Sequence, residues 1–101
     1  MEQVSGTFTA ALWLYHGAKA SWHFITLPED LSAQIRLFCG VGKRRGWNSV
    51  RVRVQIGNSV WTTSIFPDTK LNAYLLPIKA EIRTREDLHP GQETNITLAT
   101  I

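Results

Sequence analysis

Hydrophobic and polar residues alternate along several stretches of the chain. The alternation is clearest over 50–56, where the valines and Ile56 share one face and Arg51 and Arg53 share the other. Similar stretches predict further strands over 6–15, 21–27, 59–66, 71–76 and 93–100. Leu31, Ile35 and Phe38 recur at helical spacing instead. We therefore expect a helix near 29–39 whose three apolar residues face the core.

This order of elements occurs twice. Leu27-Pro28 precedes the predicted helix, and Leu76-Pro77 precedes a second segment, 78–84, where we expect a short helical turn. Both segments contain Ile-Arg, and both are followed by a glycine-containing loop and a strand. Two ββαβ units, about 5–57 and 58–101, meet at the tight turn Gly57-Asn58. The sequence thus predicts a mainly β fold, a small six-stranded double-split β-barrel in one domain spanning 1–101.

Composition limits the setting of this domain. The chain has 101 residues and one cysteine, Cys39, which excludes an internal disulfide and a cysteine metal cluster. No apolar run approaches the roughly 20 residues of a membrane span, and the first residues lack a signal-peptide pattern. We expect a cytoplasmic microbial protein without metal or cofactor. It should be a monomer, with a homodimer through an edge strand as the alternative.

The second half carries a motif order that resembles a known family. Leu76-Pro77 is followed by Ile82-Arg83, Leu88, Pro90-Gly91 and then 96–98. This order resembles the AbrB/MazE swapped-hairpin family, whose members typically supply one such half per subunit and close a double-split barrel as a dimer. The resemblance implies an AbrB-like barrel with both halves fused in one polypeptide.

The whole chain is also similar to an uncharacterised bacterial family, domain of unknown function nineteen-zero-five, which sometimes sits beside YdeI/OmpD-associated domains. The matching stretches are 22–28, 46–56, 61–64 with Pro67, 74–79, Arg83 and 88–91. The chain departs from the family pattern at Gln92-Glu93 and at Asn72-Ala73, both of which bear on turn geometry. No activity is established for that family, so the resemblance implies a fold and no mechanism.

A cationic and aromatic group forms the first candidate site. Lys79 and Arg83 are four residues apart and share one face if this segment is helical. They follow Tyr74, and the predicted hairpin brings Trp61 and Ser64 towards them. Two cations, a hydroxyl and an aromatic wall suit a small anion such as a phosphate. The alternative is that both cations form surface pairs with nearby acids, namely Glu81, Glu86 or Asp87, or cap backbone carbonyls.

The second candidate site is a basic surface for nucleic acid. Between Leu31 and Pro67 there is no acidic residue, and six basic ones occur. The proposed contacts combine a loop with the polar face of a strand: Lys43, Arg44, Arg45, Arg51 and Arg53. The alternative is a solvated basic edge that keeps the sheet from pairing with another copy. A third reading is a protein-interaction domain, which an exposed Trp13 with Tyr15 would favour, although we expect Trp13 to be buried.

Catalysis finds little support in the sequence. His16, His23 and His89 have no metal-ligand spacing, and Cys39 falls at the C-terminal end of the predicted helix, where the dipole disfavours a thiolate. Ser64 has no histidine beside it in the sequence, although folding could bring His23 close. The glycines at 40–46 lack the spacing of a phosphate-binding loop. We therefore expect a non-catalytic module that binds a small anionic ligand.

Overall fold

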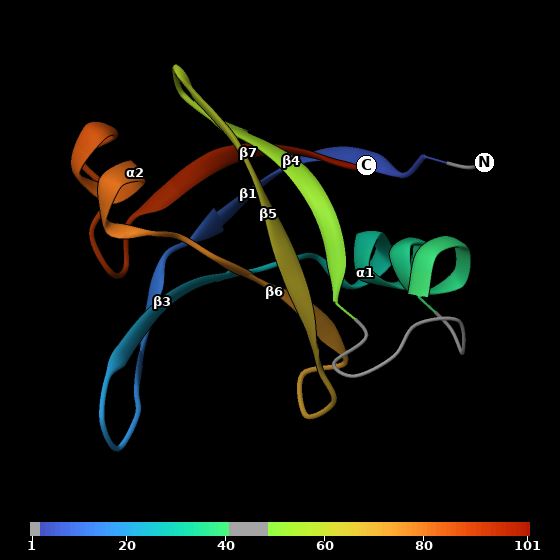
Figure 1. Ribbon diagram of the computed structural model, residues 1–101, viewed down its shortest axis with the longest axis horizontal. Coiled ribbons are helices and arrows are strands. Elements are labelled where there is room, and N and C mark those ends of the chain that lie inside the picture. Colours follow the sequence, from blue (N-terminus) through green and yellow to red (C-terminus); the bar gives the residue numbers. More distant parts are fainter. Residues whose placement is uncertain (1–2, 41–48) are drawn as a thin grey trace.

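The computed structural model describes residues 3–40 and 49–101, which form one mainly β domain (Figure 1). Its strands are β1 (Ser5–Ala11), β2 (Trp13–His16), β3 (Ser21–Thr26), β4 (Val50–Ile56), β5 (Ser59–Asp68), β6 (Ala73–Pro77) and β7 (Glu93–Thr100). Two short helices, α1 (Glu29–Ile35) and α2 (Ala80–Arg85), interrupt them, and a π-helical turn, Arg36–Gly40, follows α1. All strand pairs are antiparallel, in the order β1-β7-β4-β5-β6-β3-β2.

The sheet curls into a half-barrel because its two outermost strands belong to one bent segment. β1 pairs with β7, and β2, which begins after a single intervening residue, Leu12, pairs with β3 at the far end of the strand order. The backbone of Leu12 bonds to the loop before β7: its N–H donates to the carbonyl of Gln92 (3.0 Å), and its carbonyl accepts from Gly91 (2.7 Å). The expectation of six strands is thereby corrected, since the single strand predicted over 6–15 is divided at Leu12.

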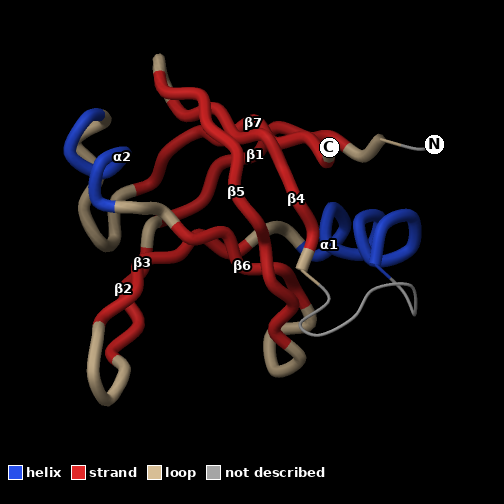
Figure 2. Tube along the Cα trace, viewed as in Figure 1, coloured by secondary structure: helices blue, strands red, loops and turns tan. Residues whose placement is uncertain are grey.

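The core fills the concave side of this sheet. Along β4 the side chains alternate strictly, with the valines and Ile56 buried and the arginines exposed, as the sequence pattern predicts. These side chains form one core cluster with buried residues of other strands, of both helices and of the connecting segments. The most deeply buried of them are Leu12, Ile25, Leu27, Ile35, Ile65, Tyr74, Leu76, Ile82, Ile96 and Leu98. Figure 2 shows the β2–β3 hairpin projecting away from this body.

Helix α1 begins as the sequence predicts and ends differently. Pro28 precedes it, Glu29 and Asp30 occupy its first turn, and Leu31 and Ile35 are buried. The prediction that Phe38 faces the core is wrong, since 53% of it is exposed. A π-helical turn is wider than an α-helical one. Counting at α-helical spacing beyond Ile35 therefore assigns Phe38 to the wrong face. The turn predicted over 78–84 is confirmed as α2.

Pro77 explains why the sheet splits beside β5. The carbonyl of Tyr74 accepts from Leu27, and the N–H of Ile78 donates to His23, so even-numbered residues of β6 direct their backbone groups to β3. Odd-numbered residues direct theirs to β5, and Pro77 has no N–H to donate there. The pairing of β6 with β5 accordingly covers Ala73 to Leu75, while its pairing with β3 continues to Pro77. Beyond that point β6 follows β3 and leaves one edge of β5 uncovered.

Candidate functional site

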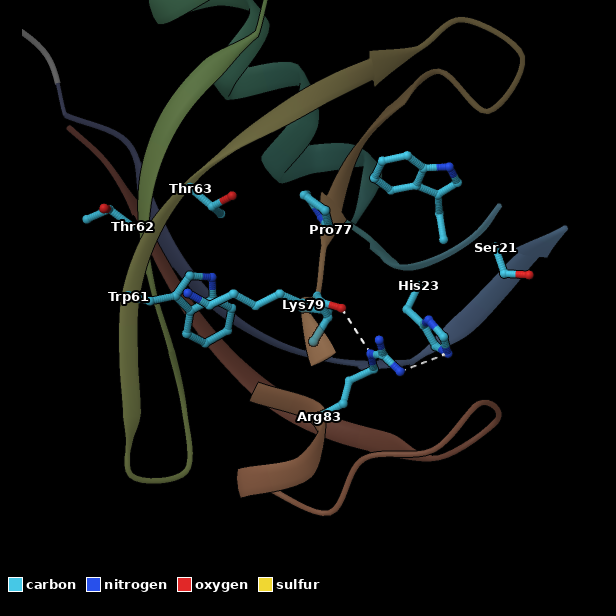
Figure 3. A pocket seen from close by; sticks show the side chains of 10 residues that line it. Ser21, His23, Trp61, Thr62, Thr63, Pro77, Lys79 and Arg83 are labelled. Atoms are coloured by element: carbon cyan, nitrogen blue, oxygen red, sulfur yellow. Dashed lines mark hydrogen bonds between the residues drawn. The ribbon is translucent and has the colours of Figure 1, made fainter. Parts of the chain in front are cut away.

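A pocket of about 360 Å³ occupies the split between β5 and β3 (Figure 3). Its lining comes from these two strands, from the end of β6 and from α2: Ser21, Trp22, His23, Trp61, Thr62, Thr63, Pro77, Ile78, Lys79 and Arg83. Three consecutive residues of β5 and three consecutive residues of β3 line the pocket. Side chains of consecutive strand residues point to opposite faces. The pocket is therefore lined by the edges of the two strands as well as by their inner faces.

Arg83 is the fixed cation of this pocket. Its Nε donates to the carbonyl of Ile78 (3.1 Å), and its Nη1 donates to Nε2 of His23 (3.3 Å), as the dashed lines of Figure 3 show. Within residues 3–40 and 49–101, no carboxylate lies within ion-pair distance of Arg83. The guanidinium is therefore held in one orientation by neutral groups, and its remaining N–H groups are left for an acceptor.

Arg83 has only N–H donors, so its contact with His23 requires the neutral form of the imidazole. Burial lowers the pKa of its imidazole, and the positive charge of Arg83 lowers the pKa further. Nε2 then carries a lone pair that accepts the Arg83 hydrogen bond, with the proton on Nδ1. The pocket consequently contains a neutral acceptor that orients the cation without cancelling its charge.

Lys79 adds a second, looser charge. Its Nζ lies 3.6 Å from a carboxylate oxygen of Glu81, and more than half of both side chains is exposed. Glu81 also accepts from Arg85 at 2.8 Å. The surface pairing that the sequence offered as an alternative is thus present for Lys79. For Arg83 no such pair is present among the described residues, and the carboxylate of Glu86 instead accepts from Ser59 Oγ (2.6 Å). The other part of that alternative, capping of a backbone carbonyl, is met by the bond from Arg83 to Ile78.

Three of the five residues predicted for the anion site meet at this pocket, and two lie elsewhere. Trp61, Lys79 and Arg83 line it. Ser64 does not, and its Oγ lies 3.4 Å from Nη1 of Arg51. Tyr74 is only 2% exposed and packs in the core, with its backbone N–H donating to Ser32 Oγ.

The pocket also contains residues that are not predicted from the sequence, among them His23, Trp22, Thr62 and Thr63. His23 and Trp22 reach it because β3 lies across the split from β5, a relation that no local pattern encodes, whereas Thr62 and Thr63 directly follow Trp61 on β5. The family resemblance could have identified them, because all four residues lie in the stretches 22–28 and 61–64 that match the family.

Comparison with known families agrees with that resemblance. Residues 8–98 match the family described as Domain of unknown function (DUF1905). The chain belongs to this family. The comparisons give no support for the AbrB/MazE resemblance of the second half. A search of curated proteins gives no match.

This DUF1905 domain has a second pocket, of about 310 Å³. It lies between the edge strand β1 and the helix α1, as the first pocket lies between β5 and α2. Its charged lining residue is Asp30, and Gln34 is its other long polar side chain. The two pockets therefore differ in charge, and only the one with Lys79 and Arg83 suits an anion.

The basic surface is described only in part. Arg51 and Arg53 are exposed on the outer face of β4, where Arg51 also contacts Thr62 Oγ1 at 3.3 Å. Lys43, Arg44 and Arg45 lie outside the described residues.

Among the described residues there is no group of three or more His, Cys, Asp or Glu placed to hold a metal ion. In that same part of the chain, no helix has the length and apolar character needed to cross a membrane.

Trp13, for which we expect burial from the sequence, is only partly buried. Its ring centroid lies 5.4 Å from that of Phe24, and its Nε1 donates to Thr26 Oγ1. The exposed aromatics of this hairpin are Tyr15 (51%) and Trp22 (55%), which face each other across β2 and β3.

Proposed function

We propose that this DUF1905 domain is a non-catalytic binding module that holds a small carboxylate or phosphate in the pocket between β5 and β3. The observation that carries the proposal is Arg83, oriented by Ile78 and His23 and without a carboxylate partner among the described residues. A guanidinium with free N–H groups binds carboxylate and phosphate oxygens through paired hydrogen bonds.

The rest of the pocket supports this assignment. A volume of about 360 Å³ lies within the range of small-molecule sites. Trp61 supplies an apolar wall, and Thr63 and Ser21 are short polar residues of the lining. The second pocket, beside α1, has an acid in its lining. This contrast supports the proposal that the positive charge of the first pocket serves to bind an anion.

The test is a titration followed by ¹H–¹⁵N NMR, with benzoate and inorganic phosphate as anions and benzamide as the neutral match for benzoate. We expect the Trp61 indole N–H and the backbone amides of 78–83 to shift with an anion and not with benzamide. Arg83→Gln should weaken anion binding at least tenfold. Arg85→Gln, which removes a charge from the same helix outside the pocket, should change it less than twofold. Equal binding by both variants, or no binding of either anion, would overturn the proposal.

We further propose that the curled sheet is a double-split barrel of two fused ββαβ repeats. The pairings support this, because exchanging the halves maps β2–β3 onto β5–β6 and β1–β7 onto β5–β4. The pairs β3–β6 and β4–β7 each join one half to the other. A circular permutant that joins β7 to β1 by a short linker and opens at Gly57-Asn58 should then fold cooperatively. A permutant that does not fold would contradict equivalent halves.

Nucleic-acid binding is the second candidate function, and the exposed arginines of β4 favour it. Arg51 contacts hydroxyl groups, and Arg53 lies on the same outer face. Binding to a single-stranded oligonucleotide should fall steeply with salt, and the Arg51→Gln/Arg53→Gln protein should show a shallower slope. Absence of binding at low salt would end this candidate. A protein-interaction role would instead use the exposed pair Tyr15 and Trp22, and their replacement by serine should then abolish partner binding without unfolding the domain.

A further inference from the structure

The uncovered edge of β5 carries backbone groups that point into the split. The two-residue turn at Gly57-Asn58 makes Ile56 and Ser59 a hydrogen-bonded pair. Pairing alternates from there, so Val60, Thr62 and Ser64 direct their N–H and C=O groups away from β4. Hydrogen bonding on β4 shows the same alternation. Arg51 stands opposite Ser64, and its carbonyl accepts from the N–H of Ile101 on the β7 side (3.1 Å), away from β5.

β6 does not reach these groups. Its pairing with β5 begins at Phe66 and Leu75, and continuing that register places Pro77 opposite Ser64. Pro77 has no N–H, and after it the chain follows β3 through the bond from Ile78 to His23. The edge of β5 over Val60 to Ser64 therefore borders the pocket without a neighbouring strand.

We propose that the pocket binds the C-terminal end of an extended peptide, which adds as a strand to the edge of β5 and places its terminal carboxylate on Arg83. This inference rests on the proposed anion site and specifies its ligand. Backbone hydrogen bonds to an open sheet edge supply affinity in such complexes, and a carboxylate contact fixes the position of the terminus.

The charges determine the direction of the peptide. α2 packs against the hairpin end of β5 through the bond between Ser59 and Glu86, so Arg83 lies toward the Ser59 end of the edge. A peptide whose carboxylate meets Arg83 then runs antiparallel to β5. The corresponding edge at β1 lies beside Asp30, which repels a carboxylate. A free C-terminus should therefore select the β5 edge over the β1 edge.

The test uses a mixed-sequence pool of N-acetylated pentapeptides with free carboxylates, and the same pool with C-terminal amides. We expect the free-acid pool to bind at least tenfold more tightly. It should slow hydrogen exchange at the amides of Val60, Thr62 and Ser64 and should lose binding in Arg83→Gln but not in Arg85→Gln. Benzoate is titrated in parallel.

Val60→Pro separates edge pairing from anion binding, because Val60 does not line the pocket. The N–H of Val60 faces the split and takes no part in the ladder with β4, so we expect the fold to tolerate proline there. The variant should bind benzoate within twofold of the parent and bind the free-acid pool at least tenfold more weakly. Should it fail to fold, a pool with N-methylated backbones supplies the same test on the unaltered protein, and its binding should be lost.

Each contrary result has a definite meaning. Benzoate binding without pool binding overturns the peptide inference and leaves the proposed function standing, whereas failure of both overturns the two together. Equal affinity for amidated peptides, undiminished binding of N-methylated peptides, or protection at the β1 edge instead of β5 would each overturn the peptide inference.

Discussion

The hydrogen bond between Ser59 and Glu86 should be one of the costlier polar contacts to remove. Ser59 is 1% exposed, and its hydroxyl donates to the Glu86 carboxylate at 2.6 Å. This length is typical of a hydrogen bond to a charged acceptor, which contributes about 1.5–3 kcal/mol. Glu86→Ala leaves the buried hydroxyl without its acceptor. We therefore expect the free energy of unfolding to fall by about 2 kcal/mol.

Urea denaturation followed by tryptophan fluorescence measures this loss. With a denaturant slope of about 1–3 kcal/mol per molar, the midpoint should fall by about 1 M while the slope stays unchanged. The melting temperature should fall by about 8–15 °C for a domain of this size. Glu81→Ala is the matched control on the same helix: its ion pairs are exposed, so its cost should stay under about 0.5 kcal/mol.

The double variant Ser59→Ala/Glu86→Ala isolates the contact itself. With both partners removed, no hydroxyl is left unsatisfied, and the two single costs should not add. The reasoning is refuted if Glu86→Ala costs no more than Glu81→Ala, or if the costs of the two single variants are strictly additive.

Three further predictions concern the turn, the histidine and the core. Gly57→Ala should destabilise the protein by at least about 1–2 kcal/mol in the same urea assay, because Gly57 has φ of 58° and an added Cβ would collide with the Glu86 carboxylate; a neutral result would contradict this. His23 should titrate by NMR below the ordinary value of about 6.5, and Arg83→Gln should raise its pKa while leaving it below that value, because burial is the larger cause. The unfolded chain then binds the proton more readily than the folded protein does, so the His23 contribution to stability should be lost as pH falls from about 6.5 through the folded-state pKa. A raised pKa in the parent protein would contradict this, because stability would then increase as pH falls. Leu76→Ala, at a fully buried position of β6, should cost about 2–5 kcal/mol in urea denaturation, and a loss under 1 kcal/mol would show that β6 does not bound the core.

Much of the fold could be predicted because its determinants are local. Strict alternation identified β4 and its buried face, and Gly57-Asn58 identified the hairpin to β5. The bend at Leu12 could not be read in the same way. It depends on hydrogen bonds to Gly91 and Gln92, which are remote in sequence. Phe38 was misplaced because a π-helical turn leaves no sign in hydrophobic spacing.

The residues of the candidate site likewise differ in whether local sequence could predict them. Lys79 and Arg83 could be grouped from their spacing near α2, and Trp61 from the hairpin opposite. His23 could not, because its place beside Arg83 requires β3 to lie next to β6 in the sheet. Tyr74 was included for its chemistry, although its position in the alternating pattern of a central strand turns it into the core. Side-chain chemistry alone does not distinguish a pocket residue from a core residue.

The most direct measurement is the Nε–H resonance of Arg83 in a ¹H–¹⁵N spectrum recorded while benzoate is added. The account predicts that this resonance shifts and saturates with the same dissociation constant as the Trp61 indole, because both groups line one pocket. An Arg83 signal that stays unchanged while benzoate shifts residues elsewhere would contradict the assignment of the anion site.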